Sequence, residues 1–184
     1  MCLGGRWVSG IVARNNYSTG IIKNCINHAT IISTPSMING CAGIASHNYG
    51  TILNCINTGL ITGISAAGIV AFSTEGIILN CINMGTIEGT EGITRAYTGG
   101  IIGSVSNGVI SHTTASNCIN YGFIKGNINV GGIVGQIQTG SNVTVYNCSN
   151  FGVVRGNNNV GCIVGRRDAG TVTNCHYDKQ MCGE

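Results

Sequence analysis

The chain has 184 residues, of which only 8% are charged, and its formal net charge at pH 7 is +3. Soluble domains typically carry about 25% charged residues, yet no apolar run here approaches the roughly 18 residues that a membrane-spanning helix needs. The only adjacent basic residues are Arg166 and Arg167. We therefore expect no membrane insertion and no nucleic acid as a partner.

The residue usage predicts an all-β chain. There are 30 glycines and one proline, which suits tight corners between short strands. Strand-forming Ile, Val and Thr dominate, while the strong helix formers are scarce. No stretch of the length of a helix keeps an apolar period of 3.6 residues.

The first residues predict a segment of a longer secreted or cell-surface protein. Residues 1–7 lack the charged segment and the apolar stretch of a signal peptide. Residues 10–13, Gly-Ile-Val-Ala, already read as the middle of a repeat, whereas terminal repeats of solenoids normally differ from the rest.

An Asn-Cys pair then returns along the whole chain. The six pairs are Asn24-Cys25, Asn54-Cys55, Asn80-Cys81, Asn117-Cys118, Asn147-Cys148 and Asn174-Cys175. Their cysteines are 30, 26, 37, 30 and 27 residues apart. A period of this size is typical of a solenoid, in which each unit stacks on the next.

The repeats divide the chain into one array of about six coils. Their approximate bounds are 1–33, 34–63, 64–89, 90–126, 127–156 and 157–184. Each has room for three strands of about five residues, which predicts a parallel β-helix with coils ~4.8 Å apart and a rod ~29 Å long. The fourth unit is stretched near residues 104–116. Its segment 111–114 could contact a partner or form an ordinary longer turn.

The recurring asparagines predict a ladder of side-chain amides along the axis. We expect the asparagine before each cysteine to point inward, and less strongly the one after it. Asn54 and Asn57 would lie over Asn80 and Asn83. The alternative is that these residues only form turns, since asparagine tolerates the left-handed backbone of a corner.

The six repeated cysteines predict a column of buried free thiols. The chain has no Cys-x-x-Cys pair, and the spacings match no zinc module. Neighbouring cysteines in register have parallel Cβ vectors, which suits a disulfide poorly. Disulfides and a metal site remain the alternatives. Four cysteines lie outside the column: Cys2, Cys41, Cys162 and Cys182. Of these four, Cys182 is the first candidate for reaction or pairing.

Apolar residues recur at positions that should face outward. One such column holds Leu60, Thr86, Phe123 and Val153, and a second holds Ile21, Thr51, Ile77 and Thr171. An exposed apolar column often marks an interaction surface. If our facing assignment is slipped by one residue, these columns would be internal instead.

The repeats resemble a known bacterial motif. The unit with Gly-Gly-Ile-Val-Gly at 131–135 and Asn-Cys-Ser-Asn-Phe-Gly at 147–152 resembles the GLUG motif of large bacterial surface proteins, which also occurs beside the catalytic domains of immunoglobulin A-cleaving metallopeptidases. The ending at 174–179, Asn-Cys-His-Tyr-Asp-Lys, resembles the segment that closes such arrays. The resemblance implies a β-solenoid in an adhesin-like protein and transfers no catalytic residue.

The residues point to no enzyme. Polysaccharide cleavage needs two carboxylates a few ångströms apart, and the six acidic residues give no convincing pair. The four histidines fall at different repeat positions, and no His-Glu-x-x-His occurs. We expect a non-catalytic structural or adhesive module without cofactor or metal, at the cell surface or secreted, with a host glycan or matrix protein as partner. The alternative is an extracellular fibre subunit that associates with itself through its coil ends or a lateral apolar face.

Overall fold

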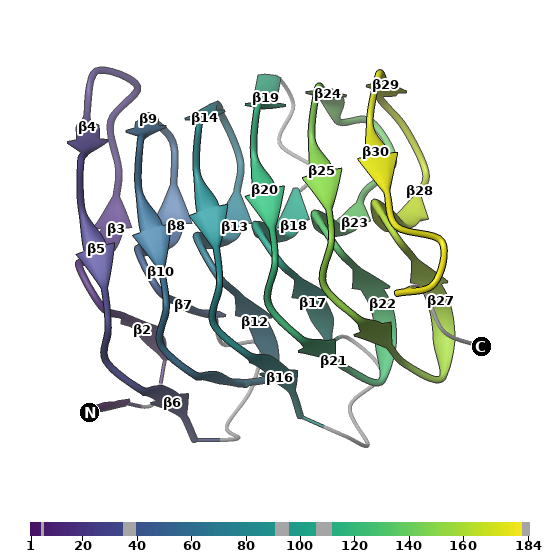
Figure 1. Cartoon of the computed structure of the whole chain (residues 1–184). Helices are drawn as coiled ribbons and strands as arrows, with labels where there is room; N and C mark the ends of the chain where they lie inside the picture. The colour runs from purple at the N-terminus through teal and green to yellow at the C-terminus, as the bar shows by residue number, and fades with distance from the viewer. Residues whose placement is uncertain (5, 35–39, 91–95, 106–111, 182–184) are drawn as a thin grey trace.

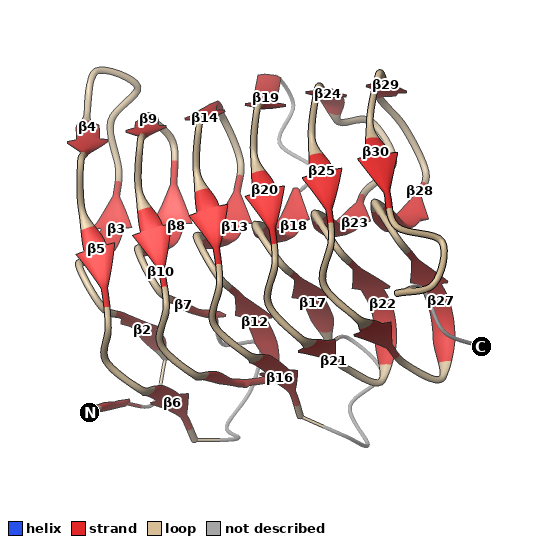
Figure 2. Ribbon diagram, viewed as in Figure 1, coloured by secondary structure: helices blue, strands red, loops and turns tan. Residues whose placement is uncertain are grey.

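The chain forms a parallel β-solenoid. The computed structural model describes residues 1–4, 6–34, 40–90, 96–105 and 112–181. Within these residues there are thirty short strands and no helix (Figure 2), and therefore no helix that could cross a membrane. The coils lie side by side from the N-terminus to the C-terminus (Figure 1). The prediction of an all-β solenoid with a period of about 30 residues is confirmed.

The strands build five sheets that run along the solenoid, each with six parallel strands. Sheet A contains β1 (Cys2–Gly4), β6 (Ile31–Ser33), β11 (Ile61–Gly63), β16 (Ile87–Gly89), β21 (Ile124–Lys125) and β26 (Val154–Arg155). Sheet B contains β2 (Trp7–Ser9), β7 (Gly40–Ala42), β12 (Ser65–Ala67), β17 (Tyr97–Gly99), β22 (Ile128–Gly131) and β27 (Asn158–Gly161).

The other three sheets complete each coil. Sheet C contains β3 (Val12–Asn15), β8 (Ala45–Asn48), β13 (Val70–Ser73), β18 (Ile102–Val105), β23 (Val134–Ile137) and β28 (Val164–Arg167). Sheet D contains β4 (Ile21–Lys23), β9 (Thr51–Leu53), β14 (Gly76–Leu79), β19 (His112–Ser116), β24 (Asn142–Tyr146) and β29 (Thr171–Thr173). Sheet E contains β5 (Ile26–Asn27), β10 (Ile56–Asn57), β15 (Ile82–Asn83), β20 (Ile119–Asn120), β25 (Ser149–Asn150) and β30 (His176–Tyr177).

The prediction of three strands per coil is wrong, because a full coil has five. Corners split the stretches that we expected to be continuous. Between β14 and β15 the chain turns at Asn80, whose φ is 52°, so strands in sheets D and E follow one another with no loop signal in the sequence. A left-handed φ ends a strand, and asparagine is among the few residues that adopt it readily.

The coils stay in register through the stretched unit. Ile78 pairs with Ala115, and Ile82 pairs with Ile119, although 37 residues separate Cys81 from Cys118. Strand β18 ends at Val105 and β19 begins at His112. Much of the predicted insertion near 104–116 therefore lies outside the described residues.

The interior consists of two apolar columns with a narrow waist between them. One column contains Ile52 and Ile78, and the other contains Ile61 and Ile87, all fully buried. At the waist, a Cβ added to Gly68 would lie 2.5 Å from Cγ of Asn83. Glycine recurs at this position because the opposite wall comes too close for any side chain.

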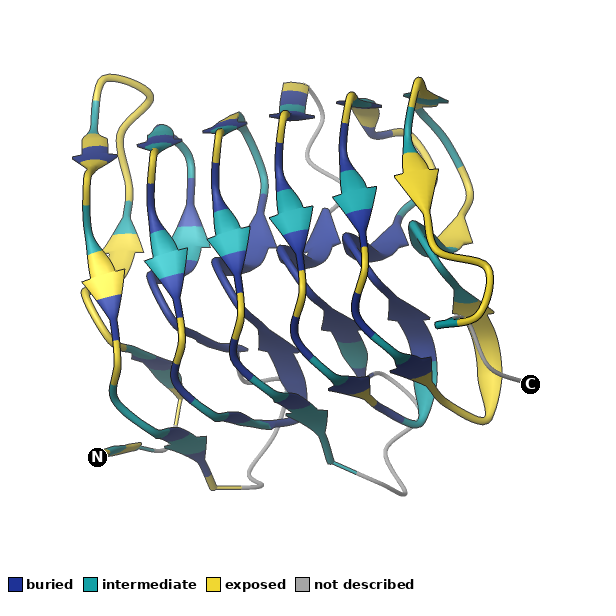
Figure 3. Cartoon of the chain, viewed as in Figure 1, coloured by how far each residue is buried: buried dark blue, intermediate teal, exposed yellow. Residues whose placement is uncertain are grey.

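Burial is greatest in the middle of the array. Strands β13 and β18 are buried along their whole length, whereas β27 and β30 of the last coil are largely exposed (Figure 3). A coil buries its apolar residues only against its neighbours, so a coil with one neighbour leaves much of its interior face open.

Candidate functional site

A buried amide ladder runs along sheet E. It is formed by the asparagine two residues after each of the first five repeated cysteines, and we call it the inner ladder: Asn27, Asn57, Asn83, Asn120 and Asn150. In the first four of them, Nδ2 donates a hydrogen bond to Oδ1 of the next asparagine, at 2.8, 2.8, 2.7 and 2.7 Å in order. Each Nδ2 also donates to a backbone carbonyl two residues further on. The buried amides are thereby satisfied.

The prediction that the asparagine before each cysteine points inward is wrong. All six of these residues are exposed and adopt φ values between 50° and 56°: Asn24, Asn54, Asn80, Asn117, Asn147 and Asn174. Some of them make a looser outer contact, since Nδ2 of Asn80 donates to Oδ1 of Asn54 at 3.2 Å. Their main role is the left-handed corner between sheets D and E.

The repeated cysteines form a column inside the coil. Cys55, Cys81, Cys118 and Cys148 are fully buried, Cys25 and Cys175 are half-buried, and all six are free thiols. Each thiol contacts a carbonyl two residues earlier, as Cys81 does with Leu79 at 3.2 Å. Hydrogen bonding to neighbouring thiols, followed by burial, raises the pKa of Cys55 and of Cys118.

The remaining cysteines differ from one another. Burial raises the pKa of Cys41 to about 12, which leaves an inert thiol. Cys2 is free and half-buried. Cys162 is disulfide-bonded, and Cys182, the residue predicted to react or pair, lies outside the described residues.

The predicted interaction column is half-buried. Leu60, Thr86, Phe123 and Val153 each precede a fully buried residue of sheet A. Because successive side chains of a strand point to opposite sides, this column lies on the outside. The ring of Phe123 is 5.9 Å from the guanidinium carbon of Arg155.

A more exposed apolar column lies beside it. Met84, Tyr121 and Phe151 directly follow residues of the inner ladder and are 52%, 50% and 42% exposed. The rings of Tyr121 and Phe151 stack with their centroids 5.4 Å apart. Together with Phe123 and Leu60, these residues form what we call the outer apolar face. This column was not predicted from the sequence, although its constant place one residue after the ladder asparagine could have indicated it.

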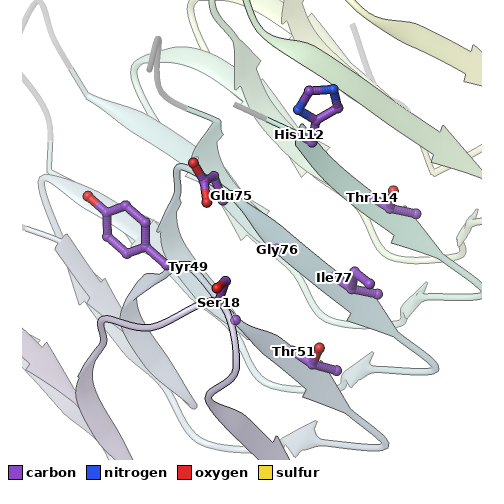
Figure 4. Close-up of a pocket in the computed structure, with 9 residues that line it drawn as sticks. Ser18, Tyr49, Thr51, Glu75, Gly76, Ile77, His112 and Thr114 are labelled. Carbon is purple, nitrogen blue, oxygen red and sulfur yellow. The ribbon is translucent and has the colours of Figure 1, made fainter. Parts of the chain in front are cut away.

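A hollow of about 420 Å³ opens at the corner where the chain enters sheet D. Its lining residues are Ser18, Tyr49, Gly50, Thr51, Glu75, Gly76, Ile77, His112 and Thr114 (Figure 4). Thr51 and Ile77 belong to the second predicted outward column. His112 and Thr114 belong to the segment 111–114 that we considered as a contact site, whereas Ser111 lies outside the described residues.

An aromatic cluster occupies the angle between sheets B and C. The ring of His47 lies 4.6 Å from Trp7 edge-on and 5.5 Å from Phe72 in a stacked arrangement, measured between centroids. Burial, and then the charge of Arg14, lowers the pKa of His47 to about 4. The histidine is thus held neutral among the aromatic rings and supports packing.

The described acidic residues are dispersed. Glu88 pairs in register with Lys125 on the outside of sheet A, and Asp168 accepts a hydrogen bond from Nε of Arg166 at 3.0 Å. Glu91 and Glu184 lie outside the described residues. Among the residues that the structure describes, no group of three or more His, Cys, Asp or Glu side chains is placed to hold a metal ion.

These features define a parallel β-solenoid with an amide ladder and a thiol column inside it. No protein-family model and no curated protein sequence matches the chain. Among solved structures, the fold is similar to the crystal structure of a "putative immunoglobulin A1 protease" from Bacteroides ovatus, with a TM-score of 0.69 and 21% sequence identity. The match covers 94% of this chain and 58% of that one, and at this identity it shows the fold alone.

Proposed function

We propose that this chain is a non-catalytic structural and adhesive module, built of GLUG-type repeats, within a cell-surface or secreted protein. The outer apolar face carries the proposal. Three large side chains that are 42–52% exposed lie together on successive coils, and exposed apolar groups of this kind mark interaction sites. The inner ladder holds the coils in register, so the face is presented as a rigid surface.

The name of the Bacteroides protein suggests one partner to test. That protein is titled a "putative immunoglobulin A1 protease", and this chain matches 58% of its length. We propose that repeats of this kind bind a host glycoprotein or matrix protein, while any cleavage belongs to other parts of such proteins. Immunoglobulin A1 is therefore a suitable probe for both binding and cleavage.

The test immobilises the whole chain and measures the retention and the integrity of immunoglobulin A1 and of purified matrix proteins. We expect retention of at least one of them without cleavage. Replacing both Tyr121 and Phe151 by serine should weaken this retention by about tenfold. The matched control is Ile21→Ser, because Ile21 is 66% exposed but lies on sheet D. Cleavage by the chain, or retention that both variants share unchanged, would contradict the proposal.

The alternative is end-to-end association into a fibre. The last coil has an open hollow of about 350 Å³, lined by Cys162, Ile163, Val164, Arg167, Val172 and Tyr177. Another coil placed there would extend the four sheets that end in β27, β28, β29 and β30, because unpaired strand edges template further strands. In sheet A, the N–H of Val154 already donates to the carbonyl of Met181. Electron microscopy at several concentrations separates the alternatives: filaments with a subunit rise of ~29 Å support assembly, and discrete particles at all concentrations oppose it.

A further inference from the structure

The hollow beside sheet D is formed by equivalent positions on three successive coils. Thr51 pairs with Ile77, and Ile77 pairs with Thr114. Tyr49, Glu75 and His112 each precede one of these residues by two positions. Adjacent strands are about 4.8 Å apart, so these three side chains form a row about 10 Å long. Figure 4 shows this row parallel to the row of Thr51, Ile77 and Thr114.

Side-chain hydrogen bonds hold the backbone that forms the floor of the hollow. Asn15 donates from Nδ2 to Oδ1 of Asn48 at 2.9 Å, and Asn48 donates from Nδ2 to the carbonyl of Gly50 at 2.8 Å. In the next coil, Oγ of Ser73 donates to the carbonyl of Glu75 at 3.1 Å. A site whose backbone is fixed in advance loses less entropy when a ligand binds.

The side chains of the row are not of one repeated type, although the ring of Tyr49 also stacks on the ring of His47 with centroids 5.8 Å apart. Positions that stack the coils keep the same residue type, as the inner ladder and the cysteine column do. Here three neighbouring coils carry a phenol, a carboxylate and an imidazole instead. All three line an open hollow, so their chemistry is directed at what enters it.

The combination of groups suits a carbohydrate. The ring of Tyr49 offers an apolar surface with a polar end. Glu75 accepts hydrogen bonds, and the hydroxyls of Thr51 and Thr114 and the imidazole of His112 can both donate and accept. A volume of about 420 Å³ lies within the roughly 300–1,000 Å³ of small-ligand pockets.

A peptide fits the hollow less well. Peptides commonly bind to a sheet by adding a strand to a free edge. Strands β9 and β14 at this hollow are paired on both sides within sheet D, so they offer no free edge.

We propose that the hollow bounded by Tyr49, Glu75 and His112 binds a short neutral oligosaccharide through hydrogen bonds and ring stacking. This inference rests on the proposed adhesive function and names a ligand class for a second face of the same module. The outer apolar face and this hollow would then contact different parts of a glycosylated partner.

The test screens the whole chain against an array of neutral oligosaccharides and measures the affinity of the best ligand by calorimetry. We expect Tyr49→Ala and Glu75→Gln each to weaken binding by about tenfold or more, as the loss of one stacked ring or one charge-assisted hydrogen bond would. The matched control is Asn142→Ala. Asn142 occupies the same position on the next coil, paired with His112, but does not line the hollow. Its replacement should change affinity by less than about twofold.

Thermal unfolding of each variant shows that a loss of binding is not a loss of fold. Absence of any oligosaccharide ligand, or a ligand that Tyr49→Ala and Glu75→Gln bind as tightly as the original chain, would overturn the inference. Retention of a protein partner through Tyr121 and Phe151 would persist in these variants. The adhesive function and the carbohydrate site can therefore fail independently.

Discussion

At the scale of single residues, the two asparagines of each repeat have opposite roles. Asn83 is fully buried, accepts from Nδ2 of Asn57 at 2.8 Å and donates to Oδ1 of Asn120 at 2.7 Å. Asn83→Ala removes two buried hydrogen bonds: one N–H of Asn57 loses its acceptor, and Oδ1 of Asn120 loses one of its two donors. We expect the free energy of unfolding in urea to fall by about 2 kcal/mol or more.

Asn80→Gly is the matched comparison for that substitution. Asn80 lies three residues earlier, is exposed and has a φ of 52°, which glycine adopts without strain. We expect a change within about 0.5 kcal/mol. Equal losses for the two variants would contradict the assignment of the ladder to the second asparagine.

A single histidine predicts a pH dependence of stability. Burial, and then Arg14, lowers the pKa of folded His47 to about 4, whereas an unfolded histidine titrates near 6.5. As the pH falls from 6.5 to 4, the unfolded chain takes up a proton that the folded chain does not. The stability that comes from keeping His47 neutral is therefore complete above pH 6.5 and is lost as the pH falls from 6.5 to 4.

Urea unfolding at pH 7.5 and pH 4.5 measures this effect. His47→Phe keeps an aromatic ring between Trp7 and Phe72 but cannot take up a proton. The loss of stability on acidification should be smaller in this variant than in the original chain. An identical loss in both would show that other groups govern the response to acid.

At the scale of elements, the sheet facing can be tested on neighbouring coils. Ile78 of β14 is fully buried, whereas Thr51 of β9 is half-buried on the outside of the same sheet. Ile78→Asp places a carboxylate in an apolar column and should abolish the cooperative thermal transition. Thr51→Asp should lower the free energy of unfolding by less than about 1 kcal/mol. Equal melting temperatures would refute the facing assignment.

The sequence allowed the period and the fold class to be predicted, but not the number of strands. Strands of two residues, such as β10 and β15, are too short to show any alternation. The error in the facing of the asparagines had a detectable signal. Cys81 and Asn83 are two residues apart, so both should point to the same side. The left-handed backbone of Asn80 hides the shared facing of Cys81 and Asn83, because it interrupts the inward and outward alternation of side chains at the end of β14.

The hollow was beyond prediction from local pattern. Tyr49, Glu75 and His112 are separated by 26 and 37 residues and share no motif. Only the observed register of β9, β14 and β19 places them in one row. When the repeats of a solenoid differ in length, residues from different coils can be placed in one site only if it is known which insertions leave the strand register intact.

At the scale of the whole molecule, the array is a stack in which each coil contacts only its neighbours. Stability in such arrays is a sum of coil and interface contributions, and it falls toward a coil with one neighbour. Strands β27 and β30 are mostly exposed, whereas β13, β18 and β23 are buried along their length. Hydrogen exchange followed by mass spectrometry should therefore show a gradient toward both ends, with residues 158–177 and the largely exposed first coil exchanging first and the middle coils last.

The same gradient connects stability to the proposed roles. The outer apolar face and the carbohydrate hollow both draw residues from β14 or β15 and their neighbours, in the protected middle of the array. Because the middle is rigid and the last coil is looser, we expect that partner binding leaves the exchange rates of residues 158–177 unchanged. Fibre assembly through the last coil would instead slow exchange there as the protein concentration rises. Uniform exchange along the whole chain would show that the array unfolds as one cooperative unit rather than coil by coil.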